Sequence, residues 1–402
     1  MIVLVLAGGS DQIALIKELK DRGHKVVLVD YFENPPAKPF ADKHIVASTL
    51  DKEAITVIAK KENVELVVTA CTDQALLTVA KVSENLSLPC YISYQTALNV
   101  TNKSYMKRIM IENDIPTAKY VLLKDVVVDS FADFKFPMVV KPVDCNSSKG
   151  VKKMETLGTV SKYLQEAINH SRTKEAIIEE FIEGEELSVD MYVENTTAKL
   201  LSITNSNKIK NENAFTITQS YYSLLNNYDE IKIVSIAQKI VNAFELKDTP
   251  LLIQMVKNKD EYFILEFSAR MGGGSKYKLI EVLSGVNIMS VYVDRILGKF
   301  PKVSPEKIVN FATMNYVYCK NGQITEFYGF DTLKENKIIE AYFYYKTVGM
   351  EILQSMYSGD RAAGYLIIAN TEKELSDRSN IAKNTIKVLG TKNTNLVKHQ
   401  WL

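Results

Sequence analysis

The chain has 402 residues, of which 46% are hydrophobic and 24% charged, which is enough for about two or three globular domains. Its 49 basic and 48 acidic residues give a formal net charge of +1, which argues against a general nucleic-acid or membrane-surface binder. The chain starts without a signal-peptide pattern, no apolar run approaches the roughly 20 residues of a membrane span, and the four cysteines form no CxxC pair. We therefore expect a reduced, cytoplasmic protein without a disulfide framework or a zinc site.

Residues 1 to about 95 alternate strand and helix patterns. Strands are predicted at 2–6, 26–30 and 66–69, and helices at 12–22, 52–61 and 74–84. This βαβ series predicts a mostly parallel, doubly wound sheet. The AGGS turn after the first strand lacks the GxGxxG spacing, so a tight structural turn is favoured over a dinucleotide site, although Asp30 ends the second strand as a ribose-binding acid would. A nicotinamide-dependent oxidoreductase is kept as an alternative, and it predicts NAD binding.

The middle and the end of the chain show other patterns. A capped helix is predicted over 99–115, beginning at Thr101 or Asn102, and short strands dominate from Pro137 onward. After residue 300, the segment FATMNYVYCK-NG-QITEFYGF predicts a β-hairpin with an Asn-Gly turn. The segment GYLIIANTEKEL predicts a strand and then a helix with a capping box from Thr371 to Glu374.

Two lysines are candidates for contacts with phosphate. Lys103 begins a predicted helix, and Lys141 lies directly behind three apolar strand residues, where a buried ammonium needs an anionic partner. The loop after Lys141 reads CNSSKGV, and small polar loops of this kind let backbone N–H groups converge on phosphate oxygens. A solvated lysine and an ordinary turn are the alternatives.

The acidic stretch IIEEFIEGEE combines carboxylates with an apolar slot. Its glutamates are followed by Phe181 and Ile182, and an adenine ring needs apolar faces together with edge hydrogen bonds. Glu186 could then accept hydrogen bonds from ribose hydroxyls. A solvated strand edge would show the same run of acids.

The stretch EFSARMGGG follows a predicted strand and is the most specific signal in the chain. Glu266, Ser268 and Arg270 fall on one face by the period of two. If the hairpin through 257–261 pairs in an even register, Gln254 opposes Glu266 on the same face, whereas an odd register separates them. Together the two side chains would form an all-oxygen site suited to Mg²⁺, with Arg270 just beyond it to neutralise a developing oxyanion.

Four elements follow one another along the chain: Lys103, Lys141 with its loop, the acidic stretch, and EFSARMGGG with Gln254 on the strand before it. In this order they resemble the ATP-grasp superfamily of carboxylate–amine ligases, in its carbamoyl-phosphate-synthetase-like and L-amino-acid-ligase-like branch. The resemblance covers nearly the whole chain and implies an α/β and α+β multidomain protein. Its expected parts are an N-terminal doubly wound parallel-sheet domain over 1–98, an ATP-grasp fold of two α+β lobes over 99–300, with a small mobile lobe at about 115–178, and a C-terminal mixed α+β domain over 301–402. The segment DRAAGYLIIANTEKEL is similar to the closing strand and helix of that branch.

The resemblance also implies a role for individual residues. The residues expected to bind ATP are Lys103, Lys141, Ser147, Ser148, Lys149, Gly150, Val151, Glu179, Glu180, Phe181, Ile182 and Glu186. Those expected to hold one or two Mg²⁺ ions, with Mn²⁺ as an alternative metal, are Gln254, Glu266 and Ser268. Arg270 is expected to be catalytic, and the expected substrate residues are Asp73, Gly272, Gly273 and Gly274, with a helix cap as the alternative for Asp73. The chain departs from the usual pattern at Gln254, where most members carry an acid, at Ser268, where asparagine is usual, and at Lys149, where many have arginine.

The activity that the resemblance implies is ATP-dependent ligation. A substrate carboxylate is activated as an acyl phosphate with release of ADP, and an amine then displaces phosphate to form an amide or peptide-like bond. The expected partners are small-molecule carboxylates and amines, amino acids among them, with no nucleic acid and no membrane, and the resemblance allows a homodimer. The alternatives are a bicarbonate-activating carboxylase or carbamoyl-phosphate-type enzyme, and an ATP-binding protein without ligase turnover.

Overall fold

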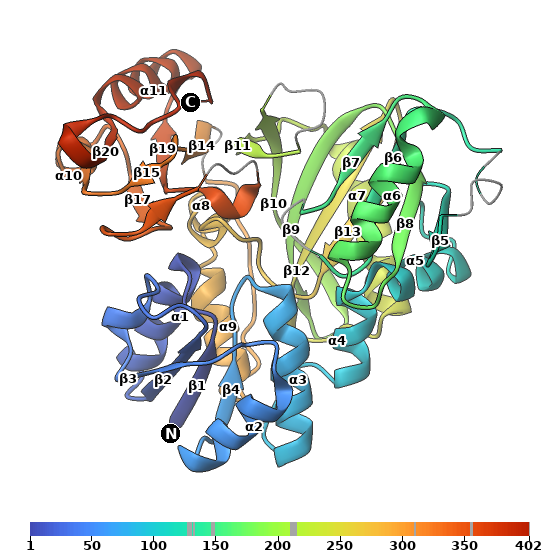
Figure 1. The fold of residues 1–402 in the computed structure, drawn as a ribbon, viewed down its shortest axis with the longest axis horizontal. Coiled ribbons are helices and arrows are strands. Elements are labelled where there is room, and N and C mark those ends of the chain that lie inside the picture. The colour runs from blue at the N-terminus through green and yellow to red at the C-terminus, as the bar shows by residue number, and fades with distance from the viewer. Residues whose placement is uncertain are drawn as a thin grey trace.

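The first part of the chain is a parallel sheet with the strand order β3-β2-β1-β4, drawn in blue in Figure 1. The structure is a computed structural model that describes residues 1–126, 131, 133–145, 149–209, 215–308, 311–353 and 357–401. The elements of this part are β1 (Ile2–Leu6), α1 (Ser10–Asp21), β2 (Lys25–Asp30), β3 (Lys43–Val46), α2 (Lys52–Lys61), β4 (Leu66–Val68) and α3 (Asp73–Leu86). The predicted βαβ series is confirmed, with bounds that shift by up to two residues.

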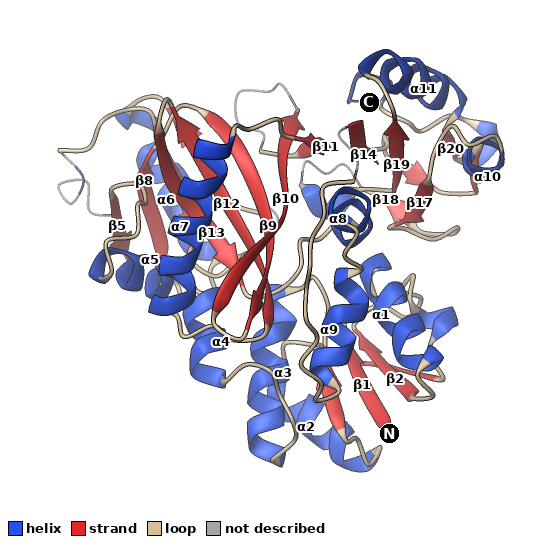
Figure 2. Ribbon diagram, turned by 180° about the vertical axis from the view of Figure 1, so that it is seen from behind, coloured by secondary structure: helices blue, strands red, loops and turns tan. Residues whose placement is uncertain are grey.

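Side chains of β1 alternate between the two faces of this sheet. Val3 and Val5 share a core with α1 and with helix α9 (Ile288–Ile296), whereas Leu4 and Leu6 share a second core with α2 and α3. Figure 2 shows α9 lying beside α1 and β1. The sheet is therefore doubly wound, as predicted, and a helix from far along the chain completes the cover of one face.

The AGGS turn is closed by the residue that a dinucleotide site would use for ribose. The backbone N–H of Gly8 donates to Asp30 Oδ2 at 2.6 Å, and the N–H of Phe32 donates to Oδ1 of the same carboxylate at 2.8 Å. A Cβ atom on Gly8 would lie 2.5 Å from the Cβ of Pro35, so only glycine fits there. The geometry favours the tight-turn interpretation over the dinucleotide alternative.

The predicted helix over 99–115 consists of two helices, α4 (Tyr94–Thr101) and α5 (Lys103–Glu112). They meet at Asn102, whose backbone is extended and whose Oδ1 accepts from the N–H of Ser104 at 2.9 Å, which caps α5. Next comes a small antiparallel sheet in the order β5-β8-β6-β7, covered by α6. Its elements are β5 (Tyr120–Leu123), β6 (Met138–Pro142), β7 (Lys152–Met154), α6 (Val160–His170) and β8 (Ala176–Glu180).

A large antiparallel sheet in the order β13-β12-β9-β10-β11-β14-β19-β17 forms the body of the molecule. Its strands are β9 (Glu185–Glu194), β10 (Thr197–Lys208), β11 (Ile217–Tyr222), β12 (Thr249–Asn258), β13 (Glu261–Ser268), β14 (Phe311–Val317), β17 (Ala341–Tyr344) and β19 (Ala363–Ala369). Helix α7 (Asn227–Ala243) covers strands β9, β10 and β12 on the side seen in Figure 2. Helix α8 (Lys276–Ser284) leads into α9. Because this sheet crosses residue 300, the domain boundaries expected from the sequence stay a prediction.

The predicted Asn-Gly hairpin is wrong. Strand β14 pairs with β11 on one side and with β19 on the other, so neither of its edges is open to the segment after Gly322. That segment forms β15 (Gly322–Gln323), which pairs with β18 (Glu351–Ile352), and β16 (Glu326–Tyr328), which pairs with β20 (Lys387–Leu389). The remaining helices are α10 (Phe330–Glu335) and α11 (Glu372–Thr385), and Thr371 caps α11 as predicted. Across the described helices, none has both the length and the apolar character that a membrane crossing requires.

Candidate active site

A cavity lies between the small sheet and the large sheet, and we call it the first cavity. Many residues predicted to bind ATP or a metal line it: Lys103, Lys141, Val151, Glu179, Glu180, Phe181, Ile182, Glu186, Gln254 and Glu266. Lys149 and Gly150 are described but do not line it, and Ser147 and Ser148 lie outside the described residues. The fold thus brings together residues from four separate segments of the sequence.

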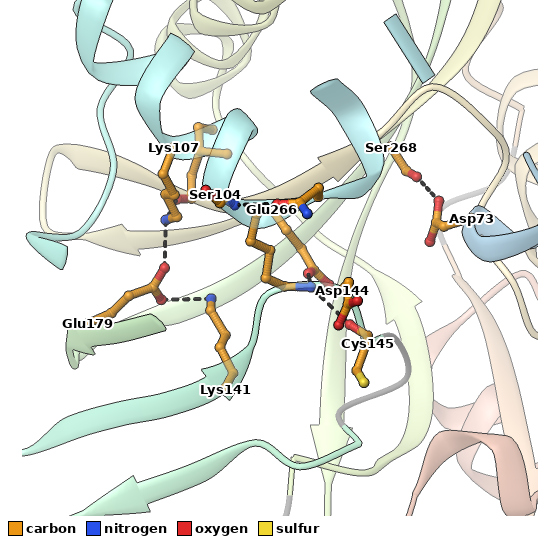
Figure 3. A network of polar contacts seen from close by, with 12 residues as sticks. Asp73, Ser104, Lys107, Lys141, Asp144, Cys145, Glu179, Glu266 and Ser268 are labelled. Atoms are coloured by element: carbon orange, nitrogen blue, oxygen red, sulfur yellow. Dashed lines mark hydrogen bonds and ion pairs between the residues drawn. The ribbon is translucent and has the colours of Figure 1, made fainter. Parts of the chain in front are cut away.

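The buried partner that the sequence demanded for Lys141 is Glu179. The Lys141 ammonium lies 2.7 Å from Glu179 Oε2, and the ammonium of Lys107 lies 2.9 Å from Oε1, so one carboxylate holds two lysines (Figure 3). Lys107 is fully buried and also donates to Thr117 Oγ1. The predicted contact of Glu179 with adenine therefore competes with two ion pairs.

The charges of this cluster shift each other's protonation. Burial opposes ionisation of Glu179, but the ammonium groups of Lys107 and Lys141 outweigh it and lower the pKa of Glu179 to about 2. Burial lowers the pKa of Lys107 to about 8, although the Glu179 charge acts in the opposite direction. Two ammonium groups around one carboxylate leave the cluster with one excess positive charge, which suits a phosphate ligand.

Other predicted ATP residues already have partners. The Glu180 N–H donates to the carbonyl of Lys119 at 3.0 Å, and the Phe181 N–H donates to the carbonyl of Pro137 at 2.9 Å. Glu186 pairs with the ammonium of Lys208, which lines the same cavity. The N–H groups of Glu180 and Phe181 are therefore engaged, and the edge contact with adenine predicted for this stretch stays a prediction.

Gln254 and Glu266 oppose each other across β12 and β13, as the sequence predicted. Next to the turn, however, Met255 pairs with Ile264, and the same register would place Leu265 opposite Gln254. A β-bulge between these pairs shifts the register and brings Glu266 to Gln254 instead. Bulges of this kind re-aim side chains near active sites.

The donor atoms of this pair fit a hard divalent cation. An amide oxygen and a carboxylate are ligands that Mg²⁺ accepts, and both residues line the first cavity. Ser268 does not join them, because its hydroxyl donates to Asp73 (Figure 3). No cluster of three or more His, Cys, Asp or Glu side chains that could hold a metal occurs in the part of the chain that the structure describes. Gln254 and Glu266 fit a divalent cation such as Mg²⁺, whose remaining ligands would have to come from phosphate and water.

Lys103 lies against the proposed metal carboxylate. Its ammonium is 3.1 Å from Glu266 Oε2 and donates to the carbonyl of Cys145 at 2.9 Å. Burial raises the pKa of Glu266, but the charges of Lys103 and Lys141 outweigh this effect and the net shift is downward. Glu266 is therefore ionised at neutral pH, and a metal cation could take the place of the Lys103 ammonium beside it.

Arg270 is held by the N-terminal part of the chain. Its Nε donates to Asp73 Oδ1 at 2.7 Å, its Nη2 donates to Asp73 Oδ2, and its Nη1 donates to the carbonyl of Met271 at 2.6 Å. The helix-cap alternative for Asp73 is not what the structure shows, because α3 begins at Asp73 and the N-cap position is Thr72.

A second cavity adjoins the first, and both are lined by Gln254 and Glu266. Asp73, Arg270, Gly272 and Gly273 line the second cavity, which has a volume of about 440 Å³. Gly274 has a positive φ of +75°, and a Cβ atom there would collide with Arg361 Nη1 and lie 2.8 Å from the Tyr316 hydroxyl. The third glycine of the motif is thus required by packing.

Comparison with known proteins identifies a family that the middle of the chain matches. Residues 134–278 match the ATP-grasp domain family. The resemblance found in the sequence is therefore confirmed, and the matched segment contains β6, β8, β12, β13 and the whole EFSARMGGG stretch.

Two relatives show how far this similarity extends. The formate-dependent phosphoribosylglycinamide formyltransferase of Sulfurisphaera tokodaii is 28% identical over 200 residues, which cover 47% of this chain and 49% of that protein. The chain thus spans about half the length of the first relatives that it matches. The phosphoribosylamine–glycine ligase of Methanosphaera stadtmanae is 23% identical over 408 residues, covering 93% of this chain and 91% of that protein.

Solved structures show that the ATP-grasp fold extends along almost the whole chain. The L-amino acid ligase from Bacillus licheniformis has a TM-score of 0.81 at 20% identity and covers 97% of this chain and 99% of its own. The biotin carboxylase domain of the Hydrogenobacter thermophilus 2-oxoglutarate carboxylase, solved with MgADP and bicarbonate, has a TM-score of 0.81 at 16% identity and covers 99% of this chain and 91% of its own.

The sequence analysis missed several residues around the two cavities. Lys107 follows Lys103 by one helical turn, so the i, i+4 spacing of the two lysines was an available signal. Lys276 is buried in the second cavity, where its ammonium contacts Ser188, Thr204 and Asp190. Tyr316 of β14 and Arg361, which lies two residues before β19, line the same cavity, and no local sequence pattern predicts that contact.

Proposed function

We propose that the protein is an ATP-dependent carboxylate–amine ligase that activates a carboxylate as an acyl phosphate, releases ADP and transfers the acyl group to an amine. The observation that carries the proposal is the position of Gln254 and Glu266, which line both cavities at once. A nucleotide in the first cavity would direct its terminal phosphate toward this pair. A carboxylate in the second cavity would then meet that phosphate beside Arg270.

In this proposal the side chains supply charge and alignment, because phosphoryl transfer asks for little covalent help from the protein. Lys141 and Lys103 bind phosphate oxygens in place of Glu179 and Glu266, their partners without nucleotide. When Mg²⁺ is bound by Gln254 and Glu266, it supplies neutralisation of phosphate charge. Arg270 donates to the carboxyl oxygen that gains negative charge as the amine attacks. One or two Mg²⁺ ions, with Mn²⁺ as an alternative, remain part of the proposal.

An organic acid is favoured over bicarbonate as the acyl donor. The second cavity is far larger than bicarbonate needs, and it is lined by several hydroxyl and charged side chains, among them Ser188, Ser220 and Lys276. Amino acids are the substrate class that such a polar cavity suits best. The solved L-amino acid ligase of similar fold is consistent with this choice.

The test is a phosphate-release screen of the standard amino acids, alone and in pairs, with ATP and Mg²⁺ and with mass spectrometry of the products. We expect ADP, phosphate and an amide product that contains one member of the pair as acyl donor. Arg270→Ala should lower the rate by about 10²–10³-fold. The control Arg378→Ala removes an arginine that pairs with Glu374 on α11, away from both cavities, and should leave the rate unchanged. ADP release that depends on bicarbonate, or ATP binding without any turnover, would overturn the proposal.

A further inference from the structure

Asp73 and Arg270 form a contact between two separate parts of the fold. Asp73 is the first residue of α3, beside the parallel sheet, whereas Arg270 follows β13 at the edge of the large sheet. The carboxylate accepts from Nε and Nη2 of the guanidinium, and the Met271 carbonyl accepts from Nη1. Every nitrogen of the guanidinium is therefore fixed by an acceptor, and its plane is set by the carboxylate.

The pair is enclosed and ionised. The side chains of Arg270 and Asp73 are 16% and 12% exposed. Burial raises the pKa of Asp73, but the adjacent Arg270 charge outweighs this effect, so the net shift is downward and the carboxylate stays charged. A guanidinium has five N–H donors, of which three are used here, so two remain for a reacting group.

We propose that Asp73 is a positioning residue that fixes the guanidinium of Arg270 beside Glu266, and that it does not serve as a ligand for a substrate ammonium. The inference rests on the proposed function, in which Arg270 meets the reacting carboxyl group. A free arginine side chain samples many rotamers, and a donor aligned beforehand needs no reorganisation during the reaction. Asp73 removes that freedom before substrate binds.

The hydrogen-bonding capacity of Asp73 argues in the same direction. A carboxylate offers about four acceptor positions. Arg270 takes two of them and the Ser268 hydroxyl takes a third. A substrate ammonium would therefore find at most one acceptor position left, on a carboxylate whose charge Arg270 already balances. Ser268, which stands where the family usually has asparagine, thus helps to orient Asp73, and Asp73 in turn orients Arg270.

The first experiment separates positioning from substrate binding. Asp73→Asn keeps the size of the side chain and removes its charge. We expect kcat to fall about 10²-fold, while the KM for the amine and the Kd for ATP stay within about threefold of wild type. An increase in the amine KM of about tenfold or more with kcat preserved would overturn the inference and assign Asp73 to the substrate. The matched control is Asp229→Asn, which removes a buried carboxylate that pairs with Lys257 and Tyr262 and lines neither cavity, and it should leave kcat unchanged.

A chemical rescue gives a readout that a purely structural role would not move. In Arg270→Gly, free guanidinium ion should bind between Asp73 and the Met271 carbonyl and restore about tenfold of the lost rate. In Arg270→Gly/Asp73→Asn, it should restore nothing. Equal rescue in both backgrounds would contradict the inference.

Calorimetric binding of guanidinium to the two variants tests the same contact without turnover. Binding only when Asp73 is present supports the inference, and equal binding contradicts it. This measurement keeps its meaning if the ligase screen finds no product, so a failure of the proposed function is distinguishable from a failure of this inference. If the variant with Asp73→Asn proves unfolded, Arg270→Gly/Asp73→Glu replaces it, because glutamate keeps the charge. This variant should retain part of the guanidinium binding, and a complete loss of binding would count against the inference.

Discussion

Replacing Glu179 by glutamine tests the energetics of the lysine cluster directly. The substitution leaves the ammonium groups of Lys107 and Lys141 without the carboxylate that lies 2.9 and 2.7 Å from them. Even with Glu179 present, the shift of the Lys107 pKa from 10.5 to about 8 corresponds to about 3 kcal/mol against the charged form. Removing one partner of a buried ion pair costs about 3–5 kcal/mol. We therefore expect the free energy of unfolding of the small sheet to fall by that amount.

The variant should also become more stable as pH rises. Lys107 has a lower pKa in the folded chain than in the unfolded chain, so between these two values the unfolded chain binds more protons and stability increases with pH. In the wild type this window runs from about 8 up to 10.5. Without Glu179 its lower limit should move toward neutral pH. Glu179 itself contributes stability that is present above pH 4.5 and is lost as pH falls toward about 2.

The assay is hydrogen exchange of the β8 amides, Ala176–Glu180, as a function of urea concentration. Glu179→Gln/Lys107→Met should recover part of the lost stability, because it removes the fully buried Lys107 charge and leaves only the Lys141 ammonium without its partner. The control Glu175→Gln breaks an ion pair with Lys124, which is 73% exposed, and should cost less than about 1 kcal/mol. A loss below about 1 kcal/mol in Glu179→Gln, or a double variant no more stable than the single one, would refute this reasoning.

Two further substitutions probe the ends of the EFSARMGGG stretch. Lys103→Met frees Glu266 from its ammonium partner, so Mg²⁺ affinity without nucleotide should rise about tenfold by calorimetry, a change of about 1.4 kcal/mol; unchanged affinity would show that Lys103 does not compete with the metal. Gly274→Ala forces a side chain into positive φ against Arg361 and should cost at least about 1–2 kcal/mol, seen as a lower melting temperature. Gly359→Ala meets nothing within 4 Å and should stay within about 0.5 kcal/mol of wild type, so equal effects of the two alanines would contradict the packing argument.

The sequence correctly predicted that Gln254 lies opposite Glu266, but the reasoning behind this prediction was only partly right. The period of two correctly placed Glu266 on the face of Gln254, and a single register of the hairpin was assumed throughout. The structure has one register near the turn and another at the site, and the bulge between them decides the contact. A bulge depends on how two strands share a twisted sheet, so the letters of one strand do not reveal it.

Local signals failed where tertiary partners competed with them. The Asn-Gly turn is a strong hairpin signal, yet β14 already pairs with β11 and β19, and the strands after the turn found other partners. By contrast, β1, β2 and β4 of the first sheet follow their local patterns closely, whereas β3, which was not predicted, completes the sheet in the order β3-β2-β1-β4. Local patterns predict contacts well when the partner is near in sequence, and poorly when it is far away.

The stretch 266–274 shows the same division within nine residues. Its chemistry is local, since a carboxylate, a guanidinium and glycines can be recognised without a fold. Its geometry is not local: Asp73 of α3 fixes Arg270, and Tyr316 of β14 and Arg361 before β19 pack against Gly274. A chain without residues 1–98 would lack the carboxylate that aligns Arg270 and the sheet face that α9 covers. The N-terminal sheet is therefore a working part of the proposed site, and its removal should abolish turnover even where the central ATP-grasp domain still binds nucleotide.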